Sequence, residues 1–124
     1  MFVTMPNTPE TLDIQSVDGA DGTRILKLTG QLTMRTLFDF QTAARNETSK
    51  AMILDVANVA YMDSAGLGSV IGVFTSCQRN NRGFAIIGVS DRISVLFEVT
   101  NVDGILPVFD SLEAAESSLA AGRA

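Results

Sequence analysis

The most informative segment of the sequence is Val59–Gly68, which reads VAYMDSAGLG. It follows the apolar run Ala51–Val56, whose length and composition predict a buried strand. Apolar residues then recur at the spacing of one helix face: Leu67, Val70, Ile71 and Phe74. Asp63 and Ser64 stand at the start of this predicted helix, where a short side-chain oxygen can accept a hydrogen bond from a free backbone N–H group. The stretch therefore predicts a buried strand followed by a capped helix.

The first turns of the predicted helix carry three glycines: Gly66, Gly68 and Gly72. Each glycine inside a helix costs about 1 kcal/mol relative to alanine, so three of them need a reason. One reason is tight packing within the domain. The other is a smooth surface, with Ala65 and Ser69 beside the glycines, on which another backbone can lie. We interpret the cluster as an interaction surface that follows a loop with an exposed apolar pair, Tyr61 and Met62.

Ser64 stands at the edge of this predicted surface, near the positive end of the helix dipole. A phosphate on its hydroxyl would add roughly two negative charges beside the carboxylate of Asp63. Serine is also among the commonest helix caps, and a cap needs no further function. The coincidence of Ser64 with the glycines favours a binding surface that phosphorylation can switch off.

Strands and helices alternate along the rest of the chain. Thr11–Val17 and Thr23–Gly30 flank the turn cluster Asp18–Gly22 and predict a β-hairpin, with its first strand at a sheet edge. Two later strands are predicted at Phe84–Val89 and Ile105–Phe109. Three more helices are predicted from inward-facing sets: Leu37, Phe40, Gln41 and Ala44; Ile93, Leu96, Phe97 and Thr100; and Leu112, Ala115 and Leu119. The pattern predicts an α/β sandwich with a mixed, mostly parallel sheet of roughly four to five strands and about four helices.

Two acidic residues have predicted local functions at the ends of elements. Asp110, with Glu113 three residues later, is predicted to cap the final helix. Asp55 lies at the end of the central strand, and we expect its carboxylate to bond to loop amides near Val59 and Ala60. Both are therefore predicted to stabilise local structure.

Length and charge limit the architecture and the partners. At 124 residues the chain is long enough for one domain but not two. We predict a flexible tail at residues 1–10 and a single domain at residues 11–122. The net charge is −5 and the nine basic residues are scattered, which argues against nucleic-acid binding. Because no stretch has the length of a membrane span or the features of a signal peptide, we expect no membrane insertion and a cytoplasmic location.

The composition also excludes several kinds of chemistry. The chain has no histidine, which excludes Ser-His-Asp and Cys-His nucleophiles and the usual zinc sites. A P-loop needs Gly-Lys-Ser/Thr, and the two lysines, Lys27 and Lys50, lie elsewhere. Cys77 is the single cysteine and is predicted to be a small buried hydrophobe. We therefore predict no catalytic residue, no metal site and no cofactor.

The segment DSAGLG at residues 63–68, with the strand before it, resembles the phosphorylation-site motif of the STAS family, the sulfate transporter and anti-sigma factor antagonist domains. The order of elements and the closing segment Val108–Ala115 are also similar, so the resemblance covers roughly residues 11–120. The resemblance implies a STAS-like sandwich and an anti-sigma factor antagonist, a partner-switching protein. It implies these partner-binding residues around Ser64: Tyr61, Met62, Asp63, Ala65, Gly66, Leu67, Gly68, Ser69 and Gly72.

The resemblance also implies a mechanism without catalysis by this chain. Its unphosphorylated form would sequester a serine kinase that is also an anti-sigma factor. Phosphorylation of Ser64 would end that binding, and a PP2C-type phosphatase would restore it. The chain departs from the family pattern at Gly30–Thr33: the family usually has Gly-x-Leu-Asp, and Thr33 replaces the aspartate expected near the phosphorylated serine.

Two alternatives stay open from the sequence. The first is a STAS subunit of an ABC-type lipid-transport complex, docked on an ATPase and never phosphorylated. The second is a nucleotide-binding or nucleotide-hydrolysing domain that uses Asp63 and Ser64 at the start of the helix.

Overall fold

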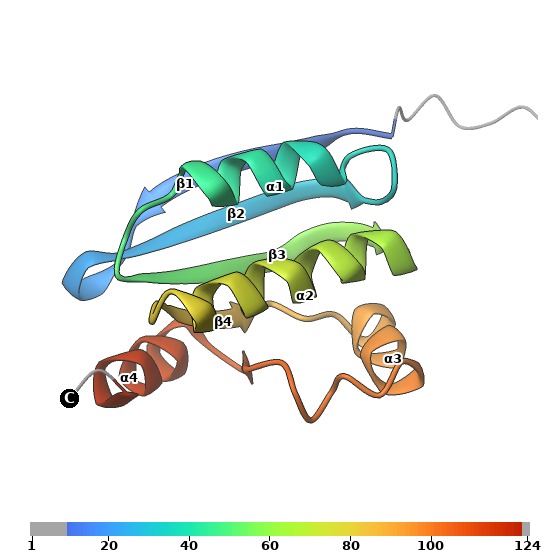
Figure 1. The fold of residues 1–124 in the computed structure, drawn as a ribbon. Helices are drawn as coiled ribbons and strands as arrows, with labels where there is room; N and C mark the ends of the chain where they lie inside the picture. Colours follow the sequence, from blue (N-terminus) through green and yellow to red (C-terminus); the bar gives the residue numbers. More distant parts are fainter. Residues whose placement is uncertain (1–9, 123–124) are drawn as a thin grey trace, which may run out of the picture.

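The computed structural model describes residues 10–122, which form a five-stranded sheet with four α-helices (Figure 1). The strands lie in chain order across the sheet. The first pair is antiparallel and the other three pairs are parallel. The strands are β1 (Leu12–Asp18), β2 (Thr23–Leu32), β3 (Ala51–Met62), β4 (Gly83–Ile87) and β5 (Val108–Phe109). The predicted α/β class, the mostly parallel sheet, the hairpin and its edge strand are confirmed.

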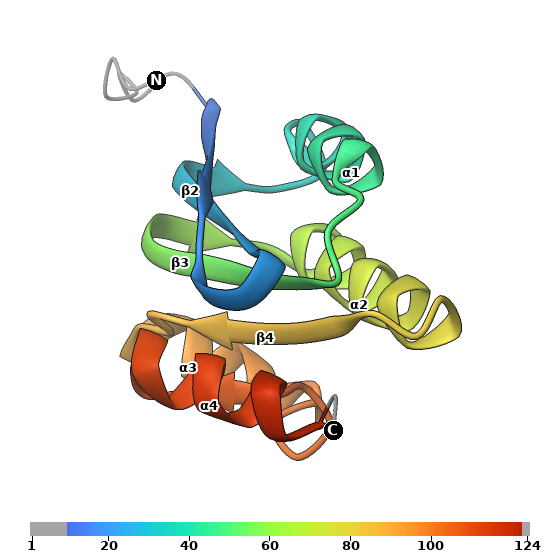
Figure 2. The same ribbon diagram turned by 90° about the vertical axis from the view of Figure 1, so that its left-hand side faces the viewer.

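The four helices cover both faces of the sheet. They are α1 (Leu37–Asn46), α2 (Ser64–Arg79), α3 (Asp91–Val99) and α4 (Leu112–Gly122). Figure 2 shows α1 and α2 together on one side of the sheet. Side chains of α1, α2 and α3 share one large apolar cluster, whereas α4 packs into a smaller cluster on the opposite face. A short 3₁₀ helix, Ala20–Gly22, closes the β1–β2 hairpin.

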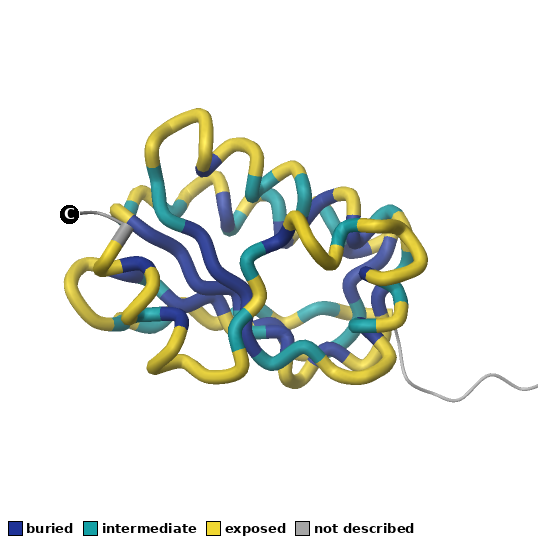
Figure 3. The backbone as a smooth tube through the Cα atoms, turned by 90° about the horizontal axis from the view of Figure 1, so that it is seen from below, coloured by how far each residue is buried: buried dark blue, intermediate teal, exposed yellow. Residues whose placement is uncertain are grey.

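The first half of β3 and most of β4 are buried and contribute to both apolar clusters; buried segments are dark blue in Figure 3. In β4, Phe84 and Ile86 join the large cluster, while Ala85 and Ile87 join the small one. Such alternation between two cores explains why this strand reads as a continuous apolar run. The prediction of a strand buried on both faces is therefore confirmed for Phe84–Ile87.

The central strand is longer than the sequence predicted. We expected it to end at Val56 with a loop through Tyr61 and Met62, but β3 continues to Met62. It does so because β2 pairs with it along its length, from Thr23 opposite Ala51 to Leu32 opposite Met62, with two register shifts. Pairing with a long neighbour supplies hydrogen bonds that the local pattern did not reveal.

Three local predictions are wrong. The cap of α4 is Ser111, whose Oγ accepts a hydrogen bond from the backbone N of Ala114 at 3.0 Å, and not Asp110. Leu112 lies on the exposed side of that helix, although Ala115 and Leu119 face inward as predicted.

The third wrong prediction concerns Asp55. Its Oδ1 accepts from the backbone N of Ala57 at 3.0 Å rather than from Val59 or Ala60. Carboxylates commonly accept from the backbone two residues ahead, so the tightest local partner is the one used.

The predicted tail at residues 1–10 lies outside the described residues except for Glu10. Glu10 has defined contacts, because its carboxylate accepts a hydrogen bond from the Thr33 hydroxyl and lies 3.4 Å from Nε of Arg35. The flexible tail stays a prediction. Among residues 10–122 no helix is long and apolar enough to cross a membrane.

Candidate functional site

The start of α2 is held by Asp63, which settles the choice between the two predicted caps. Asp63 Oδ1 accepts from the backbone N of Gly66 at 2.7 Å, and its Oδ2 accepts from the backbone N of Met34 at 3.1 Å. Ser64 is therefore the first helical residue, not the cap. It is exposed, and its hydroxyl has no hydrogen-bond partner among residues 10–122. The hydroxyl is free for another reaction or contact.

Asp63 thus accepts from one donor of the first turn of α2, the backbone N of Gly66, and from one donor of the loop after β2, the backbone N of Met34. Its carboxylate places a negative charge at the helix start, where the helix dipole favours an anion. The same carboxylate also joins α2 to the loop that follows β2. Figure 1 shows that loop and the start of α2 at the same end of the sheet.

The three glycines of α2 have different environments. A Cβ at Gly66 would lie 2.1 Å from the carbonyl oxygen of Leu32, so this position requires glycine for close packing of the helix on β2. A Cβ at Gly68 or Gly72 would meet nothing within 4 Å, and both residues are exposed. Packing within the domain explains Gly66 but does not explain the other two.

Ser64, Gly68 and Gly72 are spaced by four residues, so they lie in one row along the exposed side of α2. We call this row the α2 row. It begins at the free hydroxyl of Ser64 and has no side chain larger than a hydroxymethyl group. A partner's backbone can therefore approach α2 closely along it.

Four of the predicted partner-binding residues are buried within the domain: Met62, Gly66, Leu67 and Ser69. Ser69 donates its hydroxyl to the carbonyl oxygen of Gly66 at 2.6 Å, and Met62 and Leu67 belong to the large apolar cluster. These side chains support the surface and do not form it. Ala65 and Asp63 are partly exposed.

Tyr61 and Met62, which were both predicted to be exposed, differ in their exposure. Met62 is only 5 % exposed, whereas Tyr61 is 46 % exposed. Both are the last residues of β3, and neighbouring residues of a strand point to opposite faces of a sheet. The expectation that Met62 is exposed is wrong, because the strand extends through it and turns it into the core.

The sequence reasoning missed two exposed apolar residues near this site, Met34 and Phe38, which are 68 % and 71 % exposed. Met34 is joined to Asp63 through its backbone N. Phe38 precedes Gln41 and Arg45 by three and seven residues, so it shares their side of α1, which faces α2. Met34 lies in the loop before α1 and Phe38 lies in α1, and both could have been found as apolar residues outside the predicted inward-facing set of that helix.

Thr33, which replaces the aspartate of the family pattern, is buried in the β2–α1 loop. Its hydroxyl donates to the Glu10 carboxylate and accepts from the backbone N of Arg35 at 3.2 Å. Its own backbone N donates to Oγ1 of Thr36 at 2.9 Å. Glu10 therefore brings a negative charge to the loop position where the chain lacks the acidic side chain.

Cys77 is buried on the inner side of α2, as predicted. Burial raises the pKa of its thiol, and the positive charge of Arg82 opposes that rise only in part. The thiol is therefore protonated at neutral pH. No group of three or more histidine, cysteine, aspartate or glutamate residues that could hold a metal ion occurs within residues 10–122.

Comparison with known proteins agrees with this fold. The family model for the STAS domain matches residues 14–115. The chain is 33 % identical over 91 residues to the anti-sigma-B factor antagonist of Staphylococcus aureus, which covers 71 % of this chain and 84 % of the relative.

Two solved structures are similar in fold. An anti-sigma factor antagonist from Mycobacterium paratuberculosis superimposes with a TM-score of 0.80 at 18 % identity, covering 90 % of this chain and 96 % of that one. The phosphorylated form of the Bacillus cell fate determinant SpoIIAA has a TM-score of 0.64 at 18 % identity, covering 86 % and 97 %. With a family match over most of its length and the strand–helix arrangement around Ser64, the chain belongs to the STAS domain family.

Proposed function

We propose that the protein is an anti-sigma factor antagonist, a binding module without catalysis of its own. The observation that carries this proposal is the α2 row: an exposed, unbonded Ser64 heads two exposed glycines that packing does not require. The similarity to the anti-sigma-B factor antagonist of Staphylococcus aureus supports it. The partner is an anti-sigma factor that is also a serine kinase, bound and sequestered by the unphosphorylated form.

Contact with the partner is made by two groups of exposed residues. The α2 row, with Ala65 beside it, admits the partner's backbone, and Met34 and Phe38 supply apolar side chains next to it. Exposed aromatic and methionine side chains are enriched among the residues that anchor protein interfaces. Asp63 acts by capping α2, and the buried members of the predicted set hold the surface in shape.

Phosphorylation of Ser64 ends this binding. A phosphoserine at the first position of a helix is compatible with the helix dipole, so α2 stays folded. The phosphate nevertheless adds roughly two negative charges and bulk at the head of a smooth surface, next to the Asp63 carboxylate. A PP2C-type phosphatase then restores the binding form. SpoIIAA of Bacillus, whose phosphorylated form has a solved structure, shares the fold of this chain.

One feature of the site argues against the nucleotide alternative. The Asp63 carboxylate occupies the backbone N of Gly66 and places a negative charge at the start of α2, where it would repel a phosphate group. We propose that the protein uses no cofactor, binds no nucleic acid and is not inserted in a membrane. A protein that regulates sigma factors acts where RNA polymerase is, so we place it in the cytoplasm.

The experiment is the intact mass, with peptide mapping, of the protein purified from its native host under several growth conditions. We expect a condition-dependent gain of one phosphate on Ser64, lost in Ser64→Ala. Ser76 is an exposed serine of the same helix, and Ser76→Ala is the matched control that keeps the phosphate.

Partner binding gives the second readout. Ser64→Ala should bind the kinase constitutively and Ser64→Asp weakly. Absence of phosphate under every condition, with copurification of an ATPase complex, would contradict the proposal and favour the lipid-transport alternative.

A further inference from the structure

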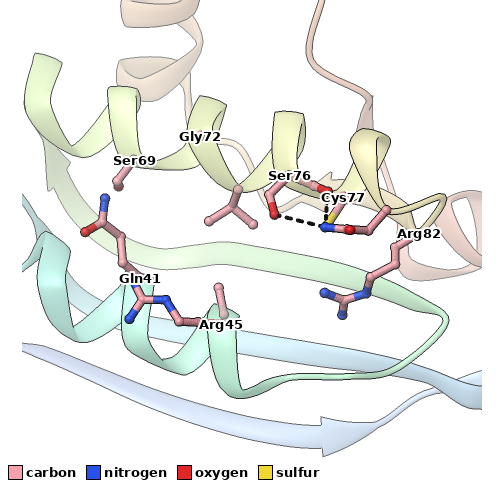
Figure 4. A pocket seen from close by; sticks show the side chains of 10 residues that line it. Gln41, Arg45, Ser69, Gly72, Ser76, Cys77 and Arg82 are labelled. Carbon is pink, nitrogen blue, oxygen red and sulfur yellow. Dashed lines mark hydrogen bonds between the residues drawn. The ribbon is translucent and has the colours of Figure 1, made fainter.

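A cavity of about 450 Å³ lies between α1 and α2 (Figure 4). Pockets that bind small molecules typically have volumes of roughly 300–1,000 Å³, so the space is large enough for a ligand of several heavy atoms. The wall combines polar, cationic and apolar groups, among them Gln41, Arg45, Gly72, Val73, Cys77 and Arg82. The cavity does not include the start of α2, but Gly72 belongs both to its wall and to the α2 row.

The charge of the cavity is opposite to that of the whole chain. Arg45 and Arg82 line it, and no carboxylate is among the described residues that form its wall. The protein as a whole has a net charge of −5. A concave wall of one charge sign concentrates the electrostatic potential, so the cavity favours an anion.

Arg82 is held by one hydrogen bond, and one of its other N–H donor groups has no partner among residues 10–122. Its Nε donates to the carbonyl oxygen of Ser49 at 2.7 Å, while its Nη2 is buried and has no hydrogen-bond partner within residues 10–122. A buried cationic donor without a partner is unfavourable. A guanidinium presents a planar fork of donors that matches the two oxygens of a carboxylate or phosphate. Since Arg82 lines the cavity, an oxyanion held there is a candidate partner for this unpaired donor.

Arg45 reaches the same cavity from α1 (Figure 4). It is exposed and forms no ion pair with any residue in the described part of the chain, so its guanidinium is free to move onto a ligand. The remaining wall, including Val73 and the protonated thiol of Cys77, is uncharged and suits an organic group. The cavity thus combines cationic and uncharged surface.

We propose that this cavity binds a small organic anion, whose carboxylate or phosphate group pairs with Arg82 and Arg45 and whose organic part lies against Val73 and Cys77. The proposal does not depend on the partner-switching function, since it concerns the cavity between α1 and α2 and not Ser64.

The test is a titration of the full chain, followed by amide NMR shifts at constant ionic strength. Three probes share one ring: phenyl phosphate, benzoate and the neutral benzyl alcohol. We expect at least one of the two anions to give saturable shifts at Gly72, Val73 and Cys77, and benzyl alcohol to give none. The stronger of the two anions identifies the oxyanion that the site prefers.

Arginine variants decide whether the binding is specific. Arg82→Gln and Arg45→Gln should each weaken binding at least about tenfold, because each removes a charged donor. Arg79 is an exposed arginine of α2 outside the cavity wall, so Arg79→Gln should bind as the wild type does. Arg45 makes no bond that folding needs, so Arg45→Gln remains informative if Arg82→Gln is unstable. Absence of saturable shifts with both anions, equal binding of benzyl alcohol, or equal effects at Arg45 and Arg79 would overturn the proposal.

Discussion

The inner and outer sides of α2 both carry glycine, for opposite reasons. On the inner side, a methyl group at Gly66 would overlap the carbonyl oxygen of Leu32. On the outer side, only two residues later, Gly68 has open space where its Cβ would be. The helix cost is about 1 kcal/mol in both places. A buried glycine is thus explained by its neighbours in the domain. An exposed helical glycine is not, and its cost points to a contact with another molecule.

The largest expected effect comes from adding a methyl group on the inner side. Gly66→Ala should destabilise the protein by about 3 kcal/mol, the upper part of the range for overpacking, because the helix must move away from β2. Urea denaturation of the variant and the wild type measures the difference. A stability equal to that of the wild type would show that α2 does not pack on Leu32 as described.

The next largest effect concerns Asp63, whose carboxylate caps α2 and also bonds to the loop after β2. Asp63→Ala should cost about 1–2 kcal/mol, because the first turn of α2 loses its acceptor. The loop amide of Met34 loses its acceptor at the same time. Asp63→Asn is the control, since asparagine caps helices about as well as aspartate. If Ser64→Ala lowers the unfolding free energy more than Asp63→Ala does, the assignment of the cap is wrong.

On the outer side, replacing glycine should raise the unfolding free energy instead of lowering it. Gly68→Ala should stabilise the protein by about 1 kcal/mol, because alanine favours the helix and its methyl group contacts nothing. Gly72→Ala should behave in the same way, and thermal unfolding measures both. The larger variant Gly68→Leu should keep the fold but weaken partner binding, since it fills the α2 row. Loss of stability in Gly68→Ala would remove the contrast between the two sides.

The smallest effect is a pH dependence at Cys77 on the inner side. Its pKa is raised in the folded state by burial, so the folded protein keeps the thiol proton to higher pH than the unfolded chain. The resulting stability is complete below the unfolded pKa of about 8.5 and is lost as pH rises through the folded value. Wild type should therefore lose unfolding free energy relative to Cys77→Ala above that pH. Urea denaturation between pH 7 and 10 measures this, and parallel curves would contradict it.

Short-range patterns predicted most elements of this fold. The hairpin, the buried strand at Phe84 and the capped helix after the central strand all depend on residues close in sequence. The main error occurred where a distant segment decides: β3 reaches Met62 because β2 pairs with it. The cap at the start of α4 was misjudged by one residue, and the apolar pattern did not reveal that Leu112 lies on the exposed side of that helix.

The sequence by itself determined that a capped helix with Ser64 at its start follows the central strand. Capping and apolar periodicity act within a few residues, so they can be read along the chain. Only the tertiary structure decided which glycines are free, and that Met34 lies beside Asp63, 29 residues away. The tertiary structure also decided the cavity, whose walls come from α1, α2 and the turn after α2. These features depend on how separate elements pack, because a side chain is exposed or buried only relative to the neighbours that the fold brings to it.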